Sequence, residues 1–127
     1  MEEHILVVDD SPTIRSAVSF CLRNAGYEVS EAKDGKDGLK KLESMKESRQ
    51  GLALIVTDIN MPQMDGITFI KNVKKSNFRF LPILVFTTES KKSILEKGRA
   101  VGASGWLVKP FQPEQLLWAV KKLVWPK

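Results

Sequence analysis

Five short apolar runs alternate along this chain with five segments whose apolar residues recur at helical spacing. In a chain of 127 residues, this alternation is typical of β-α-β units and of one parallel sheet. Right-handed crossovers place helices on both faces, and strands covered on both sides are continuously apolar. We therefore predict a doubly wound α/β fold. Its strands are expected at 4–9, 28–32, 52–57, 81–87 and 105–108, and its helices at 13–25, 35–47, 65–75, 91–101 and 112–125.

Glycines and prolines lie where these helices should begin and end. Gly26 and Gly102 each follow a helical segment, as a glycine that ends a helix does. Pro12 and Pro113 lie in first turns, where a missing N–H costs nothing. The segment 47–51 is too short to divide domains. We expect one domain over residues 1–127, with no output domain.

The composition favours a cytoplasmic protein. No apolar stretch approaches the roughly 18 residues that a membrane-spanning helix needs, so membrane insertion is not expected. The acidic start of the chain does not resemble a signal peptide. The single cysteine, Cys21, excludes an internal disulfide and favours a reducing compartment. Its apolar neighbours at helical spacing favour an inert core thiol.

The net charge of +5 raises the question of an anionic partner. A basic protein can bind nucleic acid or an anionic membrane. Here, however, the lysines occur in pairs spread over the helical segments, and no arginine-rich arm or aromatic stripe accompanies them. This distribution favours solvated helix faces, and we expect no nucleic acid partner. The pairs are residues 40–41, 74–75, 91–92 and 121–122.

Polar residues follow the ends of four apolar runs. Asp9 and Asp10 follow the first run, Asp58 follows the third, Thr87 ends the fourth, and Lys109 follows the fifth. The carboxyl ends of parallel strands share one edge of the sheet, where ligands bind. Each residue alone is compatible with a capping aspartate or a solvated lysine. Their joint occurrence favours one site. On the second strand, Glu31 and Lys33 fall near the same edge without an obvious pairing.

Such a set of side chains has a definite electrostatic requirement. Three carboxylates within about 5 Å repel by roughly 3 kcal/mol per pair at an effective dielectric of about 20. A hard divalent cation such as Mg²⁺ removes that cost, and a phosphate often completes its coordination. A lysine and a hydroxyl opposite would hold a phosphoryl group. The sequence therefore predicts a Mg²⁺-dependent phosphoryl site.

The motifs around these residues resemble those of receiver domains of two-component response regulators, over nearly the whole chain. Within that family the chain is most similar to single-domain chemotaxis regulators, a likeness carried by residues 60–62, 88–92 and 102–105. The strand order 2-1-3-4-5, which is flavodoxin-like, is adopted from this resemblance. The motifs are Ile-Leu-Val-Val-Asp-Asp-Ser at 5–11, Thr-Asp-Ile-Asn-Met-Pro-Gln-Met-Asp-Gly at 57–66, Val-Phe-Thr-Thr-Glu at 85–89 and Gly-Ala-Ser-Gly-Trp-Leu-Val-Lys-Pro-Phe at 102–111.

The resemblance implies a role for each acidic residue. Asp58 would be the phosphoacceptor, taking a phosphoryl group from a histidine kinase. Asp10 and Asp58 would supply carboxylate oxygens to Mg²⁺, with the backbone carbonyl of Asn60 as a further ligand. Asp9 would act through a metal-bound water. The chain would catalyse only its own phosphorylation and dephosphorylation.

The resemblance also implies how the signal is passed on. Thr87 would hydrogen-bond the phosphoryl group and Lys109 would pair with it, aimed by a cis peptide before Pro110. The surface formed by the fourth helix, fifth strand and fifth helix would then shift and bind a downstream protein. Two residues depart from the family pattern: Thr88 is bulkier than the usual small residue, and Trp106 stands where tyrosine or phenylalanine is usual.

The motifs also bear on three other functions. A phosphorelay intermediate that passes its phosphoryl group to a second histidine protein stays open as an alternative. An aspartate-based phosphatase is disfavoured, because Asp9 is followed at plus two by Ser11 and Asp10 by Pro12. A nucleotide-binding protein is disfavoured by the lack of a glycine-rich phosphate loop. We expect a monomer or a weak dimer.

The last helical segment suggests a surface for the partner. Two tryptophans, Trp118 and Trp125, lie seven residues apart on the side of this helix opposite its predicted core face. They lie beside Lys121 and Lys122. These four residues would form an anchor patch next to Trp106, since tryptophan is enriched at binding hot spots. The alternative is that Trp125 frays and Trp118 covers a loop. The core face is Leu116, Ala119, Val120 and Leu123, flanked by Leu117 and Val124.

Overall fold

The computed structural model describes residues 3–48, 51–88 and 92–124, and in them the predicted alternation of strands and helices is confirmed. The strands are β1 His4–Val8, β2 Glu28–Ala32, β3 Leu52–Thr57, β4 Ile83–Thr87 and β5 Gly105–Val108. The helices are α1 Pro12–Asn24, α2 Gly35–Ser48, α3 Gly66–Lys74, α4 Lys92–Val101 and α5 Pro113–Leu123. Every strand pairing is parallel, and the order is β2-β1-β3-β4-β5.

Each strand and helix begins and ends within two residues of its predicted bounds. The largest difference at a strand start is in β4, which was expected from residue 81 and begins at Ile83. Pro82 precedes it and has no N–H to donate to the sheet, although its carbonyl accepts a hydrogen bond from the N–H of Ile55 at 3.2 Å. Gly26 and Gly102 have φ of 101° and 115°, the left-handed conformation expected of a glycine that ends a helix.

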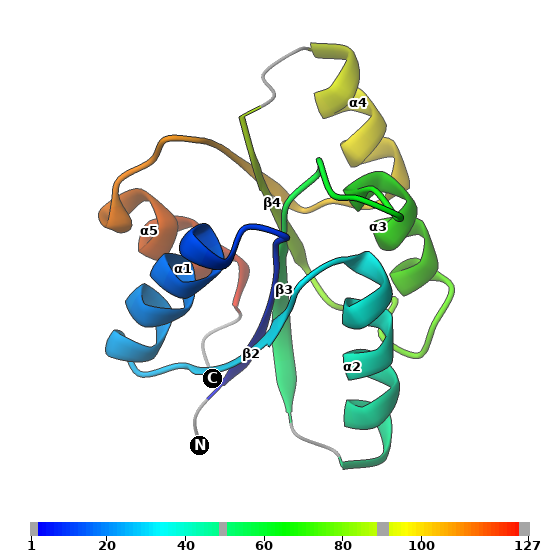
Figure 1. The fold of residues 1–127 in the computed structure, drawn as a ribbon, viewed down its shortest axis with the longest axis horizontal. Helices are drawn as coiled ribbons and strands as arrows, with labels where there is room; N and C mark the ends of the chain where they lie inside the picture. Colours follow the sequence, from blue (N-terminus) through cyan, green and yellow to red (C-terminus); the bar gives the residue numbers. More distant parts are fainter. Residues whose placement is uncertain (1–2, 49–50, 89–91, 125–127) are drawn as a thin grey trace.

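The sheet is covered on both faces, with α1 and α5 on one side and α2, α3 and α4 on the other (Figure 1). Alternate strand residues therefore enter two different cores. In β1, Ile5 and Val7 belong to the core under α1 and α5, whereas Leu6 and Val8 belong to the core under the other three helices. All four are completely buried. Burial on both sides accounts for the continuous apolar runs of the sequence.

The last helix presents the predicted face to the core. Leu116, Ala119 and Val120 are buried, and Leu123 packs on the same cluster. Trp118, on the opposite face, is 64% exposed. Among the helices that the structure describes, none has the length and apolar character needed to span a bilayer.

Two helix starts form the walls of the strand-end region. Ser11 caps α1, with its hydroxyl accepting from the N–H of Ile14 at 3.3 Å. Asp65 caps α3 by accepting from the N–H of Thr68 at 2.9 Å. Gly66 follows this cap and lies against the chain just after β3, where a Cβ would collide with the carbonyl oxygen of Asp58. The absence of a side chain lets α3 begin directly beside Asp58.

Candidate functional site

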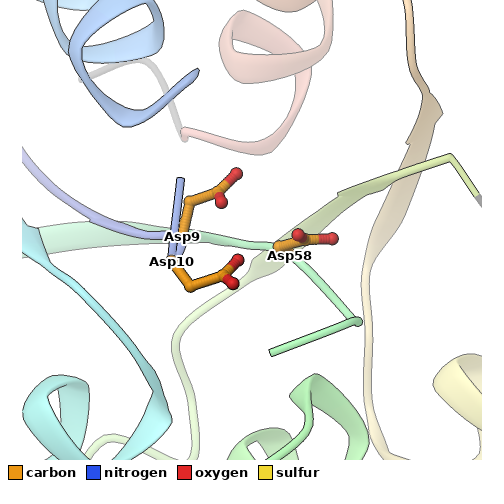
Figure 2. A group of neighbouring side chains, drawn as sticks. All are labelled: Asp9, Asp10 and Asp58. Carbon is orange, nitrogen blue, oxygen red and sulfur yellow. The ribbon is translucent and has the colours of Figure 1, made fainter. Parts of the chain in front are cut away.

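Three carboxylates meet at the carboxyl ends of the two central strands. Asp9 and Asp10 follow β1 and Asp58 follows β3, and carboxylate oxygens from all three lie within 4.8 Å of one another. Figure 2 shows the side chains projecting to the same side beyond the strand ends. Asp9 and Asp58 are buried, while Asp10 is exposed. The predicted convergence of these residues is confirmed, and the group could hold a metal ion.

Lys109 connects two of these acids. Its Nζ lies 3.3 Å from Oδ2 of Asp9 and 3.4 Å from Oδ2 of Asp58, and its side chain is only 13% exposed. Nζ also lies 4.8 Å from the centroid of the Phe86 ring. The backbone N–H of Lys109 donates to the carbonyl of Thr87 at 2.7 Å, which ties the β5 end to the β4 end. The predicted cis peptide between Lys109 and Pro110 is present.

Asp9 is the most deeply placed acid. It is completely buried, and burial is the main reason why the pKa of its carboxyl is raised, with the Asp58 charge adding to the rise. The N–H of Ser11, which donates to Oδ1 at 2.8 Å, and the ammonium group of Lys109 act in the opposite direction. One ammonium group cannot neutralise three carboxylates. A further cation at the exposed Asp10 side would relieve the remaining repulsion.

Asp58 is oriented by its own loop. Its Oδ1 accepts from the N–H of Ile59 at 2.7 Å and more weakly from that of Asn60 at 3.4 Å. The N–H of Gly66 donates to the carbonyl of Ile59 at 2.7 Å and folds the loop back on itself. The bonds from the N–H groups of Ile59 and Asn60 occupy Oδ1, while Oδ2 faces Lys109. The second carboxylate oxygen is therefore the one directed to the shared site.

The two threonines after β4 are placed differently. Thr87 is completely buried at the strand end, whereas Thr88 is exposed. Thr88 borders an apolar cavity of about 450 Å³ between α1 and the chain that leads into α5. Lys109 and Cys21 also line this cavity. Thr88 and Lys109 therefore border the same cavity.

The structure pairs a residue for which the sequence showed no partner. Glu31 accepts from Nε of Arg15 at 3.2 Å and lies 3.3 Å from Nη1 of Arg23, two partners that the sequence did not indicate. Arg15 also donates from Nη1 to the carbonyl of Asp9 at 2.8 Å. The missed partners lie 16 and 8 residues away along the chain, and only the packing of α1 beside β2 brings them together. Lys33 is exposed, and its backbone N–H donates to Asp37.

Trp106 and Trp118, two tryptophans of the expected partner face, lie on different sides of the sheet. Trp106 packs against the core under α2, α3 and α4, and its indole N–H is buried with no acceptor among the described residues. Trp118 lies on α5, with Nζ of Lys122 4.8 Å from its ring centroid. Lys121 is exposed. Trp125 falls outside the described residues, so the patch next to Trp106 stays a prediction.

Comparison with protein families identifies the type of domain. Residues 5–121 match the family described as the response regulator receiver domain. This match covers every residue of the strand-end site. The resemblance inferred from the sequence motifs is thereby confirmed.

Two chemotaxis proteins are similar to this chain over almost their whole lengths, and a transcriptional regulator is similar over about half of its length. The chemotaxis protein CheY1 of Helicobacter pylori is 37% identical over 114 residues, which is 88% of this chain and 89% of that protein. The structure of the Vibrio cholerae chemotaxis protein CheY4 superposes with a TM-score of 0.88 at 44% identity, covering 97% of this chain and 99% of that one. The Bacillus subtilis transcriptional regulatory protein PhoP is 35% identical over 98% of this chain, but the match spans 49% of PhoP.

Proposed function

Because this chain belongs to the response regulator receiver family, we propose that it is a stand-alone phosphorylation switch with Asp58 as the phosphoacceptor. The observation that carries the proposal is the position of Lys109, whose Nζ lies between the buried carboxylates of Asp9 and Asp58 while its backbone is tied to Thr87. A carboxylate, an ammonium group and a hydroxyl-bearing residue thus lie at adjoining strand ends, which supports the proposal. Phosphoryl transfer depends mainly on such positioning and charge neutralisation.

In this proposal, Oδ2 of Asp58 attacks the phosphorus atom of a phosphohistidine on a kinase. The new P–O bond forms as the P–N bond breaks, and the electron pair stays on the histidine nitrogen. The bonds from the N–H groups of Ile59 and Asn60 hold Oδ1 in place during the attack. Lys109 then pairs with the transferred group, and Thr87 hydrogen-bonds it.

A divalent cation, Mg²⁺ in this proposal, would neutralise charge on the phosphoryl oxygens when bound. The residues present fit it, because hard oxygen ligands surround one partly open position. Asp10 and Asp58 would supply carboxylate oxygens, Asn60 its backbone carbonyl, and Asp9 a contact through water. Mg²⁺ usually keeps several waters, so we expect weak binding.

The output of the switch would be a change of surface. A phosphoryl group adds about 1.5–2 negative charges and new acceptor oxygens at the β4 and β5 ends. Its contacts with Thr87 and Lys109 supply the free energy that favours a second packing of α4, β5 and α5. Trp106, Trp118, Lys121, Lys122 and Trp125 would line the face that a downstream protein binds.

The similarity to chemotaxis proteins supports a chemotaxis pathway for this switch. Its partners would be a histidine kinase as phosphodonor and a downstream protein, in the cytoplasm. A pull-down with and without beryllofluoride, which mimics the phosphoryl group, tests this part. Proteins captured only with beryllofluoride would identify the output, and their absence would contradict a phosphorylation-dependent partner.

The phosphoacceptor is tested by labelling with acetyl phosphate and Mg²⁺, followed by intact mass spectrometry. The unaltered protein should gain one phosphoryl group, and Asp58→Asn should gain none. Asp65→Asn is the matched control, because Asp65 is an exposed cap of α3 on the same loop. It should be labelled normally. Undiminished labelling of Asp58→Asn would overturn the assignment.

A further inference from the structure

The Arg15 guanidinium group bridges two neighbouring strands next to the acidic site. Arg15 lies in the first turn of α1, and its side chain is only 19% exposed. Nη1 donates to the carbonyl of Asp9 at 2.8 Å, and Nε pairs with Oε1 of Glu31 on β2 at 3.2 Å. A charged side chain with so little exposure loses hydration, and that loss needs compensation by bonds of this kind.

Every polar group of Asp9 has a hydrogen-bond or ion-pair partner. Its N–H donates to the carbonyl of Ala32 on β2 at 3.2 Å, and its carboxylate accepts from Ser11 and pairs with Lys109. Arg15 holds the remaining group, the carbonyl. Asp9 is therefore a fixed point in the site.

Asp10 is joined to this fixed point by a peptide bond. Its carboxylate is exposed, and within residues 3–48, 51–88 and 92–124 no hydrogen bond or ion pair restrains it. The peptide group between Asp9 and Asp10 is planar, so holding the Asp9 carbonyl sets the direction in which the chain enters Asp10. The backbone from which the Asp10 side chain extends toward Asp58 is held in this way.

We propose that Arg15 is a positioning residue for the divalent cation site, which orients Asp10 through the Asp9–Asp10 peptide. This inference rests on the metal site of the proposed function. Residues that orient metal ligands from outside the coordination sphere typically change metal affinity by about 10–100-fold when replaced.

If Arg15 had a purely structural role, the outcome would be different. Replacing Arg23 distinguishes this role from the positioning of Asp10. Arg23 lies on the same helix, 3.3 Å from Oε2 of the same Glu31, and donates to the carbonyl of Val29 at 3.1 Å. Unlike Arg15, it forms no hydrogen bond or ion pair with Asp9. If Arg15 only fastens α1 to β2, replacing either arginine should have similar effects. If Arg15 positions Asp10, only its own replacement should alter metal binding.

The test is a titration of the purified protein with Mn²⁺, in which electron paramagnetic resonance measures the free ion and Mg²⁺ competes for the site. Arg15→Met should weaken Mn²⁺ and Mg²⁺ binding by about tenfold or more, and Arg23→Met should leave both affinities within about twofold. Arg15→Lys should recover part of the loss, because an ammonium group reaches the carbonyl but lacks the guanidinium fork. Circular dichroism verifies that each variant is folded.

A weaker metal affinity of Arg15→Met could not result from the loss of its positive charge alone. Removing a positive charge near a cation site strengthens cation binding by Coulomb's law, so weaker binding by Arg15→Met requires a change of geometry. Unchanged affinity in Arg15→Met, or an equal loss in Arg23→Met, would overturn the inference while leaving the metal site intact. If the unaltered protein binds no Mn²⁺, the metal part of the proposed function fails, and this role of Arg15 fails with it.

Discussion

The indole of Trp106 packs against the backbone of α4 at Gly98. A Cβ at Gly98 would lie 2.6 Å from Cζ3 of Trp106, closer than side chains approach one another. Gly98 is the buried residue of α4. The glycine therefore makes room for an aromatic residue that is larger than the tyrosine or phenylalanine usual at this position.

We expect Gly98→Ala to displace Trp106. Alanine in place of a helix glycine gains about 1 kcal/mol of stability, but overpacking at the indole costs about 1–3 kcal/mol. The substitution should therefore be neutral or destabilising in the unaltered protein. In a Trp106→Phe background, where the clash is smaller, the same substitution should be stabilising. Urea unfolding of the four proteins measures this coupling, and equal effects of Gly98→Ala in both backgrounds would contradict the contact.

Access to the phosphoryl site should depend on Thr88. Its exposed, branched side chain borders the cavity beside Lys109. We expect Thr88→Ala to be phosphorylated several-fold faster by acetyl phosphate, because a smaller side chain leaves more room for the donor. Thr88→Val, which keeps the shape and removes the hydroxyl, is the control and should react like the unaltered protein. Identical labelling and decay rates in Thr88→Ala would show that Thr88 does not limit access.

Cys21 should be a slow nucleophile. It is half-buried in the wall of the apolar cavity, and burial raises the pKa of its thiol, with the charge of Glu114 adding to the rise. Native protein should thus react with iodoacetamide more slowly than urea-unfolded protein at pH 8. Because the folded state holds the proton more tightly, stability should fall as the pH rises above the ordinary thiol value of 9.0.

The control for the thiol is Cys21→Ala. Between pH 8 and pH 10, the free energy of unfolding of this variant should fall less than that of the unaltered protein, because the contribution of Cys21 is absent. Equal alkylation rates for folded and unfolded protein would mean that the thiol is reactive in the folded state.

Trp118 should contribute more to binding than to stability. It is 64% exposed, and its contact with Lys122 is worth about 0.5–1 kcal/mol at such a site. Trp118→Ala should therefore lower the free energy of unfolding by no more than about 1 kcal/mol, while weakening capture of the beryllofluoride-dependent partner or self-association. Phe20→Ala, which removes a 71% exposed aromatic side chain from α1, is the matched control. A large loss of stability with normal binding would assign Trp118 to the fold.

Asp10 should be required for metal binding. Magnesium titration followed by tryptophan fluorescence should show weak, saturable binding that is lost in Asp10→Ala, because the remaining ligands cannot replace a carboxylate oxygen. Asp37→Ala, which removes a half-buried acid of α2, should leave the titration unchanged. A curve for Asp10→Ala that matches the unaltered protein would exclude Asp10 as a ligand.

Patterns local in the sequence were sufficient to predict the elements and the site. Apolar runs identified the five strands, and helical spacing identified the five helices, among the described residues. A strand buried on both faces is apolar throughout, whereas a helix buried on one face has apolar residues three or four positions apart. The same reasoning placed Asp9, Asp10, Asp58 and Lys109 together, since parallel strands bring their carboxyl ends to one edge. The strand order came from the family resemblance.

Contacts between elements could be known only from the tertiary structure. The pairing of Arg15 with Glu31 depends on the packing of α1 beside β2, and the carbonyl that Arg15 holds depends on where β1 ends. The match of Gly98 with Trp106 depends on the packing of α4 over β5. A sequence period specifies which face of an element is buried, but the distance and register between two elements result from the packing of all side chains together. For this reason the sequence determined the fold class and the acidic site, and the three-dimensional packing alone decided which side chains support them.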